Sequence, residues 1–376
     1  MKKVLLYYMS NKHSVAMETI CRTVIEAGYE LQVLTLCERG PFHQRIETMG
    51  IKTAVYNIPR KPSLKFFFKH IFFLRNYIRK NKIDTIWSHF PEANIIAITA
   101  GRLSGKKVVS FRHHDESAFY REYGKQFGMT RNKKEIFLDK LINRFAKTLV
   151  VLSGHVLHTI LKYENGNKKR IVVCPLIYDF SMYGIPDKRI IDKIVGQLPC
   201  QLRLIMVSRM SEAKQHLPVF EVIDKLVREG MSIKMIVMDE GPMKPALEKF
   251  IEQNNLHEHI LMPGYCDDIT NYMAAADLLI HPSLTEASNN VVKEMGYLEK
   301  AVAVCRGVGD FDDYIRNNIN GYLMERGELK ASIESVLRHA YANSGQLSEM
   351  GKKLKEDVLH LFSDTPENKE RFLKLI

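Results

Sequence analysis

The strongest constraint on this chain is a regular alternation of short apolar runs with longer segments of helical periodicity. Seven such runs occur before residue 178 and five after residue 201: 4–8, 31–36, 53–58, 85–88, 107–111, 148–152 and 171–174, then 202–207, 233–238, 259–262, 278–280 and 301–305. Short Val/Ile/Leu runs separated by helices are typical of parallel βαβ units whose strands are buried on both faces. The sequence therefore predicts two successive α/β domains, each built on an open parallel sheet.

The alternation lapses between residues 179 and 200, which predicts a linker with one short helix. We therefore expect an N-terminal Rossmann-like domain at 1–178 and a C-terminal one at 201–355, with a final helix at 356–376 packing back towards the first domain. Ligands of open parallel sheets bind beyond the carboxyl ends of the strands. If the two sheets face each other, the cleft between them is the expected active site.

Composition excludes several other classes of protein. With 376 residues, of which 45% are hydrophobic, the chain can form a large core and is not a disordered polymer. The six cysteines are scattered without a C-x-x-C pair, which indicates reduced thiols and no structural zinc. The first apolar run is broken by Asn11 and Lys12, so it is interpreted as a strand rather than a signal peptide. No segment approaches the ~20 apolar residues that cross a bilayer, and we expect a cytoplasmic protein.

Positive charge is concentrated in the first half of the chain. Residues 1–178 hold 31 Lys and Arg against 13 Asp and Glu, whereas residues 179–376 hold 24 against 30. The excess is greatest at 60–82, where eight basic residues surround many aromatic ones. One interpretation is an amphipathic helix with its aromatic rings in the core. Another is a helix lying on an anionic membrane, peripheral to its inner face, through Lys65, Lys69, Arg75 and Arg79. We find no nucleic-acid-binding module.

Two basic residues follow the apolar run at 202–207. Arg209 and Lys214 lie between that run and a helix expected to begin near His216. A guanidinium and an ammonium at the carboxyl end of a strand, beside a helix N-terminus, form a site for an anion, best a diphosphate. The alternative is a pair of solvated loop residues.

Two glutamates, eight positions apart, flank the strand-to-helix turn expected after the run at 278–280. Glu286 follows the run at 278–280, and Glu294 falls about one turn into the following helix. Carboxylates accept hydrogen bonds from sugar hydroxyls but repel a diphosphate. The backbone amides of Ser288, Asn289 and Asn290 at the helix start are candidates for phosphate contact. Glutamates at this spacing are also common on ordinary surface helices.

The second half resembles the retaining glycosyltransferases of the GT-B fold, in particular glycosyltransferase family four. The resemblance is strong over about 202–324 and weaker, mainly in strand-helix order, before it. Its motifs occur in the family's order: Ser208-Arg209-x4-Lys214, Met238-Asp239-Glu240-Gly241-Pro242, Met262-Pro263-Gly264-Tyr265, Ala274-Ala275-Ala276-Asp277, Pro282-Ser283, Glu286-x7-Glu294 and Asn320-Gly321-Tyr322-Leu323. Each is weak alone, but seven in register are specific.

The resemblance implies a role for each candidate residue. Arg209 and Lys214 would hold the diphosphate of a nucleotide sugar. Glu286 would lie near the donor sugar and Glu294 would bind the ribose. The donor contacts implied in addition are Gly241, Ser288, Asn289 and Asn290. A histidine after an N-terminal strand commonly lies beside the donor sugar, and His113 is preferred to His114. The further sugar or acceptor candidates are His114, Asp115 and Asn11. A hydrogen-bonded loop is the alternative interpretation of the His-His-Asp run.

The chain departs from the family pattern in two loops. Met9 to Ser14 stand where the family usually has a Gly-Gly loop, and 287–289 stand where it usually has a Gly-Phe-Gly run. These departures affect acceptor and sugar specificity. No metal or other cofactor is expected, because basic side chains and helix termini would neutralise the leaving diphosphate. Asp267-Asp268 is interpreted as a helix N-cap and 310–313 as a loop before a helix, rather than as metal sites.

The resemblance implies a hexosyltransferase-type enzyme that moves a sugar from a nucleoside diphosphate to a hydroxyl. The basic aromatic stretch at 60–82 suggests a lipid-linked or polysaccharide acceptor, as in surface polysaccharide or lipopolysaccharide biosynthesis. Two other functions remain open at this point. One is a nucleotide-sugar epimerase of the same architecture, and the other is a non-catalytic protein that binds nucleotide sugars or anionic polymers.

Overall fold

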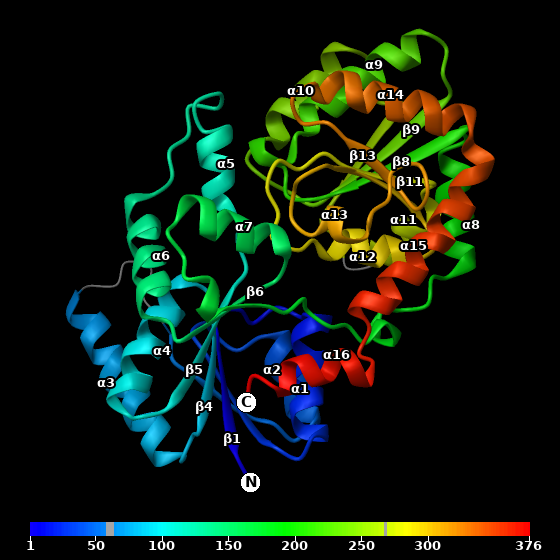
Figure 1. Ribbon diagram of the computed structural model, residues 1–376. Helices are drawn as coiled ribbons and strands as arrows, with labels where there is room; N and C mark the ends of the chain where they lie inside the picture. Colours follow the sequence, from blue (N-terminus) through cyan, green and yellow to red (C-terminus); the bar gives the residue numbers. More distant parts are fainter. Residues whose placement is uncertain (58–63, 267–268) are drawn as a thin grey trace. The chain divides into compact units, whose positions relative to one another are not determined.

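A computed structural model describes residues 1–57, 64–266 and 269–376 of the protein. The described residues form two compact units of helices and parallel strands (Figure 1). The first unit comprises residues 1–182 and 362–376, and the second comprises residues 183–361. The α/β architecture with two parallel sheets, expected from the sequence, is confirmed.

The sheet of the first unit has seven described strands in the order β3-β2-β1-β4-β5-β6-β7, and all pair in parallel. The strands are β1 (Lys3–Tyr8), β2 (Glu30–Thr35), β3 (Lys52–Val55), β4 (Thr85–His89), β5 (Lys107–Arg112), β6 (Thr148–Val151) and β7 (Ile171–Val173). The helices are α1 (Val15–Glu26), α2 (Pro41–Thr48), α3 (Leu64–Lys80), α4 (Pro91–Leu103), α5 (Glu116–Glu122), α6 (Lys133–Phe145), α7 (Gly154–Tyr163) and α16 (Pro366–Leu373), with short turns η1 (Lys168–Arg170) and η2 (Phe180–Met182).

The sheet of the second unit has six described strands in the order β10-β9-β8-β11-β12-β13, again parallel. The strands are β8 (Leu202–Val207), β9 (Ile233–Met238), β10 (Ile260–Gly264), β11 (Leu278–His281), β12 (Ala301–Cys305) and β13 (Tyr322–Met324). The helices are α8 (Lys188–Gln197), α9 (His216–Arg228), α10 (Lys244–Gln253), α11 (Ile269–Ala275), α12 (Asn290–Tyr297), α13 (Phe311–Tyr314), α14 (Leu329–Ala342) and α15 (Leu347–Phe362), with short turns η3 (Glu212–Lys214) and η4 (Ser344–Gln346).

All twelve expected strands are present, with bounds that shift by up to three residues, and one further strand was not expected. That strand, β13, has only three residues, too few to show a periodic pattern, and it forms by pairing with β12. Residues 310–313 are not a loop before a helix, because Asp312 and Asp313 lie in the first turn of α13. The pair Asp267-Asp268 lies outside the described residues.

The strand order places two loops of the second unit at one edge of its sheet. All six residues of β8 are buried, as expected for a strand covered by helices on both faces. β8 lies between β9 and β11, so the chain leaves β8 towards one side of the sheet and leaves β11 towards the other. Such a switch point opens a crevice at the carboxyl ends of the strands. Residues following β8 and β11 therefore lie at a position where ligands of such sheets bind.

The basic aromatic helix α3 has one buried face and one exposed face. Its inner face is buried through His70, Ile71, Leu74 and Ile78, as an amphipathic core helix requires. Phe68 and Phe72 remain 54% and 55% exposed on the outer face. Lys65, Lys69 and Arg79 are exposed and Arg75 is half-buried. Within the described parts of the chain, no helix combines the length and apolarity that crossing a bilayer requires.

Candidate functional site

An ion pair joins the loops that follow β8 and β11. Lys214, at the end of η3, forms an ion pair and hydrogen bond with Oε1 of Glu286, and its Nζ lies 3.3 Å from Ser283 Oγ. The backbone N–H of Leu284 donates to the carbonyl of Ala213 at 2.8 Å, which holds the two loops together. The side chains of Lys214 and Glu286 are 20% and 12% exposed, so the pair is shielded yet accessible. The structure thus brings together Lys214 and Glu286, two of the eight residues expected at the donor site.

The Glu286 carboxylate has a second partner. His281, buried at the end of β11, donates from Nε2 to Glu286 Oε1 at 2.7 Å. Burial opposes the charged form of Glu286, but the Lys214 charge and the His281 hydrogen bond outweigh burial and hold the pKa of Glu286 well below its usual range. Glu286 is therefore ionised at neutral pH and acts only as a hydrogen-bond acceptor.

A buried lysine fixes the turn between Glu286 and α12. Lys293 is fully buried, and its Nζ donates to Asp310 Oδ2 at 2.8 Å, to Ser288 Oγ at 2.9 Å and to the carbonyl of Asn289 at 2.9 Å. Ser288 Oγ also donates to Asp310 Oδ2 at 2.7 Å. Asn289 caps α12 by accepting from the backbone N–H of Val292 at 3.0 Å. The helix N-terminus is thus held in place, with Asn290 exposed at its first position.

The remaining donor-site candidates lie around this cluster. Glu294 is half-buried on α12, and its Oε1 accepts from the hydroxyl of Tyr183 at 3.0 Å. Arg209 follows β8 and is exposed, and its side chain forms no ion pair or hydrogen bond with a described residue. A Cβ on Gly241 would lie 2.3 Å from the carbonyl oxygen of Met210, so only glycine fits against the loop that carries Arg209.

In the first unit, His113 forms a pair with a second histidine. His113 follows β5 and is half-buried, and its Nε2 lies 2.7 Å from Nδ1 of His89 at the end of β4. The ring of His113 also stacks on Phe90, with centroids 5.3 Å apart. Burial and the neighbouring His114 lower the pKa of His113 to about 4. Burial and the neighbouring His113 also hold the pKa of His89 well below its usual value, so both imidazoles are neutral at pH 7.

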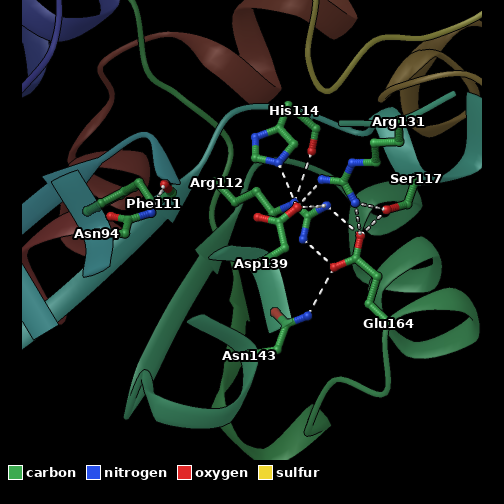
Figure 2. A network of polar contacts seen from close by, with 9 residues as sticks. All are labelled: Asn94, Phe111, Arg112, His114, Ser117, Arg131, Asp139, Asn143 and Glu164. Atoms are coloured by element: carbon green, nitrogen blue, oxygen red, sulfur yellow. Dashed lines mark hydrogen bonds and ion pairs between the residues drawn. The ribbon is translucent and has the colours of Figure 1, made fainter. Parts of the chain in front are cut away.

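A buried polar network holds the segment that begins with Arg112 (Figure 2). The Arg112 guanidinium donates to both oxygens of Glu164, at 2.5 and 2.7 Å, and to the carbonyl of His114 at 3.2 Å. The His114 ring lies 3.2 Å from Asp139 Oδ2, and Arg131 pairs with the same carboxylate. His114 is therefore engaged within the network, whereas His113 is directed at His89.

Asp115 and Asn11 occupy separate surroundings. Asp115 is buried before α5, and its Oδ2 lies 2.5 Å from Nε2 of His155. Asn11 is half-buried, donates to the carbonyl of Glu38 at 2.9 Å and accepts from the backbone N–H of Phe42 at 3.0 Å. Hydrogen bonds to Glu38 and Phe42 thus anchor the loop at 9–14.

The sequence did not predict several of these partners. His281 precedes the Glu286-x7-Glu294 motif, Lys293 lies within it and Asp310 follows it. No pattern in the sequence marked these three residues as contacts of the motif. Arg112, Arg131, Asp139 and Glu164 are up to 52 residues apart and form no motif. A buried pair of this kind leaves only one signal in the sequence, a charged residue within or beside an apolar run, as at the end of β5.

We expect Glu164→Gln to destabilise the first unit. Arg112, with a side chain only 3% exposed, would lose the carboxylate that it contacts at 2.5 Å and keep only Asp139 at 3.5 Å, and a broken buried pair costs about 3 kcal/mol. Unfolding in urea, followed by the fluorescence of Trp87, the single tryptophan, reports on this unit. Glu92→Gln is the control, because Glu92 pairs with Lys134 at the surface.

The loss of stability caused by Glu164→Gln should depend on pH. Arg112 and Ser117 hold the pKa of Glu164 below its usual value, although burial opposes this. The Glu164 carboxylate therefore stabilises the folded state fully at pH values above its pKa in the unfolded chain, about 4.3. This contribution is lost as the pH falls through the lower pKa that Glu164 has in the folded protein. The difference between parent and Glu164→Gln should shrink on acidification. Equal stability of the two proteins at pH 7 would contradict the assignment.

Two family models match the chain. "Glycosyl transferases group 1" matches residues 187–357, and "Glycosyltransferase Family 4" matches residues 14–181. The Escherichia coli UDP-Gal:alpha-D-GlcNAc-diphosphoundecaprenol alpha-1,3-galactosyltransferase is 22% identical over 331 residues, which are 87% of this chain and 84% of that protein. The Staphylococcus aureus poly(ribitol-phosphate) alpha-N-acetylglucosaminyltransferase is 26% identical over 244 residues, which are 65% of this chain and 46% of that protein.

Solved structures resemble the whole chain. Anabaena Alr3699/HepE in complex with UDP and glucose has a TM-score of 0.80 at 18% identity, and the match covers 100% of this chain and 99% of that chain. Sucrose-phosphate synthase from Thermosynechococcus elongatus has a TM-score of 0.79 at 14% identity, covering 100% and 97%. At such identities the likeness concerns the fold alone, and it confirms the fold class expected from the sequence.

Proposed function

The chain belongs to glycosyltransferase family 4, with the GT-B fold, and from this premise we propose that it is a retaining enzyme using a nucleoside-diphosphate sugar. The sugar is transferred to a hydroxyl of a lipid-linked or polysaccharide acceptor in surface-glycan biosynthesis. The observation that carries the proposal is the Lys214–Glu286 pair at the switch point of the second sheet, beside the capped N-terminus of α12.

The basic groups suit a departing diphosphate. Arg209 supplies a guanidinium that is exposed and unpaired among the described residues, and Lys214 supplies an ammonium that is already fixed in place. Negative charge grows on the diphosphate as the bond to the sugar breaks, so these cations stabilise the transition state more than the ground state. The amides at the start of α12 add a third source of positive potential. In this proposal no metal ion is required.

The carboxylates suit hydroxyl groups of the donor. Glu286 is ionised and shielded, so it accepts hydrogen bonds from the sugar without titrating near neutral pH. Glu294, one turn into α12, is assigned to the ribose. The neutral His113 is assigned to a sugar contact, because its low pKa leaves it uncharged at neutral pH.

The charge state of Glu286 also bears on the mechanism. A carboxylate held by Lys214 and His281, with a depressed pKa, is a weak base and is not free to attack the sugar. We therefore assign proton acceptance to the leaving phosphate, with attack and departure on the same face of the sugar. This route retains the anomeric configuration and needs no covalent enzyme intermediate.

The relatives support this choice of substrates. The printed name of the Escherichia coli relative gives a UDP-linked donor and a diphosphoundecaprenol-linked acceptor. Anabaena HepE is described in complexes with UDP and with UDP-glucose. UDP-sugars are therefore the first donors to examine here, and a lipid diphosphate is the first acceptor carrier.

Replacing the cations should reduce turnover. We expect Lys214→Ala and Arg209→Ala each to lower kcat by about 100-fold, as for other groups that stabilise transition-state charge, with little change in the KM for acceptor. Lys225→Ala is the matched control, because Lys225 pairs with Glu334 on the surface of α9. Steady-state rates with a panel of UDP-, GDP- and ADP-sugars provide the measurement. Parent-like kcat in both site variants would refute the assigned site.

The stereochemistry of the product gives a separate test. With an α-linked nucleotide sugar, we expect the first product observed by proton NMR to be an α-glycoside, and we expect chelation with EDTA to leave the rate unchanged. A β-glycoside would exclude the retaining route. A rate abolished by EDTA and restored by a divalent cation would exclude the metal-free site.

We further propose that α3 brings the enzyme to an anionic membrane surface. Phe68 and Phe72 are more than half exposed, in helical register with Lys65, Lys69 and Arg79. Exposed aromatic rings enter the headgroup region, and each Lys or Arg near the surface adds about 1 kcal/mol. Such a position would suit an acceptor that carries a lipid.

Vesicle sedimentation tests this surface. We expect the protein to sediment with vesicles containing phosphatidylglycerol at low salt, and Lys65→Glu/Lys69→Glu/Arg79→Glu to abolish sedimentation while leaving kcat on a short soluble acceptor unchanged. Sedimentation of this triple variant at the parental level would remove α3 from the proposal.

A further inference from the structure

Two pockets lie at the other edge of the first sheet, where its strands begin. One pocket of about 460 Å³ lies between the end of α4, the end of α6 and the first residues of β5 and β6. A second pocket of about 780 Å³ lies between the end of α6 and the segment from Tyr163 to Arg170. Phe145, the last residue of α6, lines both pockets. We call the two pockets together the basic groove.

The lining of the basic groove is strongly cationic. The first pocket is lined by Arg102, Lys106, Lys107 and Lys147, and no Asp or Glu lines it. The second is lined by Lys140, Arg144 and Arg170. Its one acidic residue, Glu164, is neutralised by the buried Arg112 (Figure 2). A cleft lined by one sign of charge concentrates counter-ions of the opposite sign.

Of these seven cations, Lys106 pairs with Asp84, and the other six form no ion pair with an acidic residue that the structure describes. Lys107, Lys140 and Lys147 are exposed, and no ion pair engages them. Lys107 also lies close enough to Lys2 for the two positive charges to repel each other, and this repulsion adds to the effect of burial in lowering the pKa of Lys107. Such unneutralised charges raise the electrostatic energy of the folded protein unless an anion binds there.

The groove also carries groups suited to sugars. Phe145 is 37% exposed, with the Arg102 and Arg144 guanidiniums 5.0 and 5.9 Å from its ring centroid. Asn143, Asn165 and Asn167 line the second pocket. The amide nitrogen of Asn143 donates to Glu164 at 3.0 Å, and its buried Oδ1 has no hydrogen-bond partner (Figure 2). A buried amide oxygen without a partner is costly and favours a ligand that donates a hydrogen bond.

We propose that the basic groove binds an acidic glycan, a chain of sugars that carries repeated carboxylate or phosphate groups. The lysines contact the charged groups of the chain, and the asparagines contact its hydroxyls. Two adjoining pockets suit a chain that continues past Phe145 better than a single small anion. This inference concerns binding alone and does not depend on the donor site.

The first pocket of the basic groove is separate from the residues assigned to the reaction. The first residue of β5, Lys107, lines the groove, whereas the last residue, Arg112, precedes His113. Six residues of parallel strand place these ends roughly 16 Å apart. The glycan segment in the first pocket is therefore not the segment that accepts the sugar. The groove is a second contact, which would keep a growing or anchored acidic chain on the enzyme.

The shape and chemistry of the groove favour a glycan over other polyanions. A membrane presents its charges in a plane and is contacted by protruding aromatic rings, which this unit carries on α3. Single-stranded nucleic acid is usually bound by successive aromatic rings that stack on bases. The only rings that line the described part of the groove are those of Phe145 and Tyr163, and amide groups are more numerous.

Calorimetric titration of the full chain without donor tests the proposal. The probes are an oligogalacturonate, which carries carboxylates, and a phosphorylated mannan, which carries phosphates. We expect Lys107→Gln/Lys140→Gln/Lys147→Gln to weaken binding of at least one polymer about tenfold, from the usual strength of exposed ion pairs. The matched control is Lys65→Gln/Lys69→Gln/Arg79→Gln on α3, which removes the same charge and should stay within about twofold of the parent.

Two further arms separate the remaining outcomes. Asn143→Ala should weaken binding of the better polymer but leave inorganic tripolyphosphate binding unchanged, because only the glycan offers hydroxyl donors. The proposal is overturned if the parent binds neither polymer at low salt, or if both triple variants lose binding equally. It is also overturned if the groove variant loses binding to a DNA oligonucleotide or to anionic vesicles but retains binding to the polymers.

Discussion

The ion pair between Lys214 and Glu286 is the interaction on which the proposed chemistry depends. It joins loops that follow two neighbouring strands, and it exists because the parallel order places β8 beside β11. The pair holds the Lys214 side chain close to where a diphosphate would leave in the proposed reaction, and it keeps the Glu286 carboxylate ionised. In the proposed site, one contact thus places a group suited to an anion beside a group suited to hydroxyls.

Each unit supports its candidate residues with a buried charge cluster. In the second unit, Lys293 and Asp310 hold the start of α12. In the first, Arg112 and Glu164 hold the segment that carries His113 and His114. Both clusters pair opposite charges that are almost fully excluded from water. Such pairs contribute little net stability, but their hydrogen bonds define one geometry, and removing one partner is costly.

The sequence predicted the α/β architecture and most strand positions because buried parallel strands leave continuous apolar runs. It also placed Lys214 and Glu286 in one site, through motifs whose order matches a known family. It did not predict β13, which is three residues long, or the partners His281 and Lys293, which are defined only once the chain is folded. The outer face of α3 was ambiguous for a related reason: periodicity identifies a buried face, but it does not determine which aromatic rings remain exposed on the other.

The return of residues 362–376 to the first unit has a consequence for synthesis. Phe372 is fully buried there, with ring centroids 6.3 Å from Trp87 and 6.4 Å from Phe111, and the carbonyl of Ile376 accepts from Thr85 Oγ1 at 3.3 Å. Domains generally fold in order of their emergence from the ribosome. Here the first unit lacks part of its own interior until translation has passed through the whole of the second, so the unit that begins first is completed last.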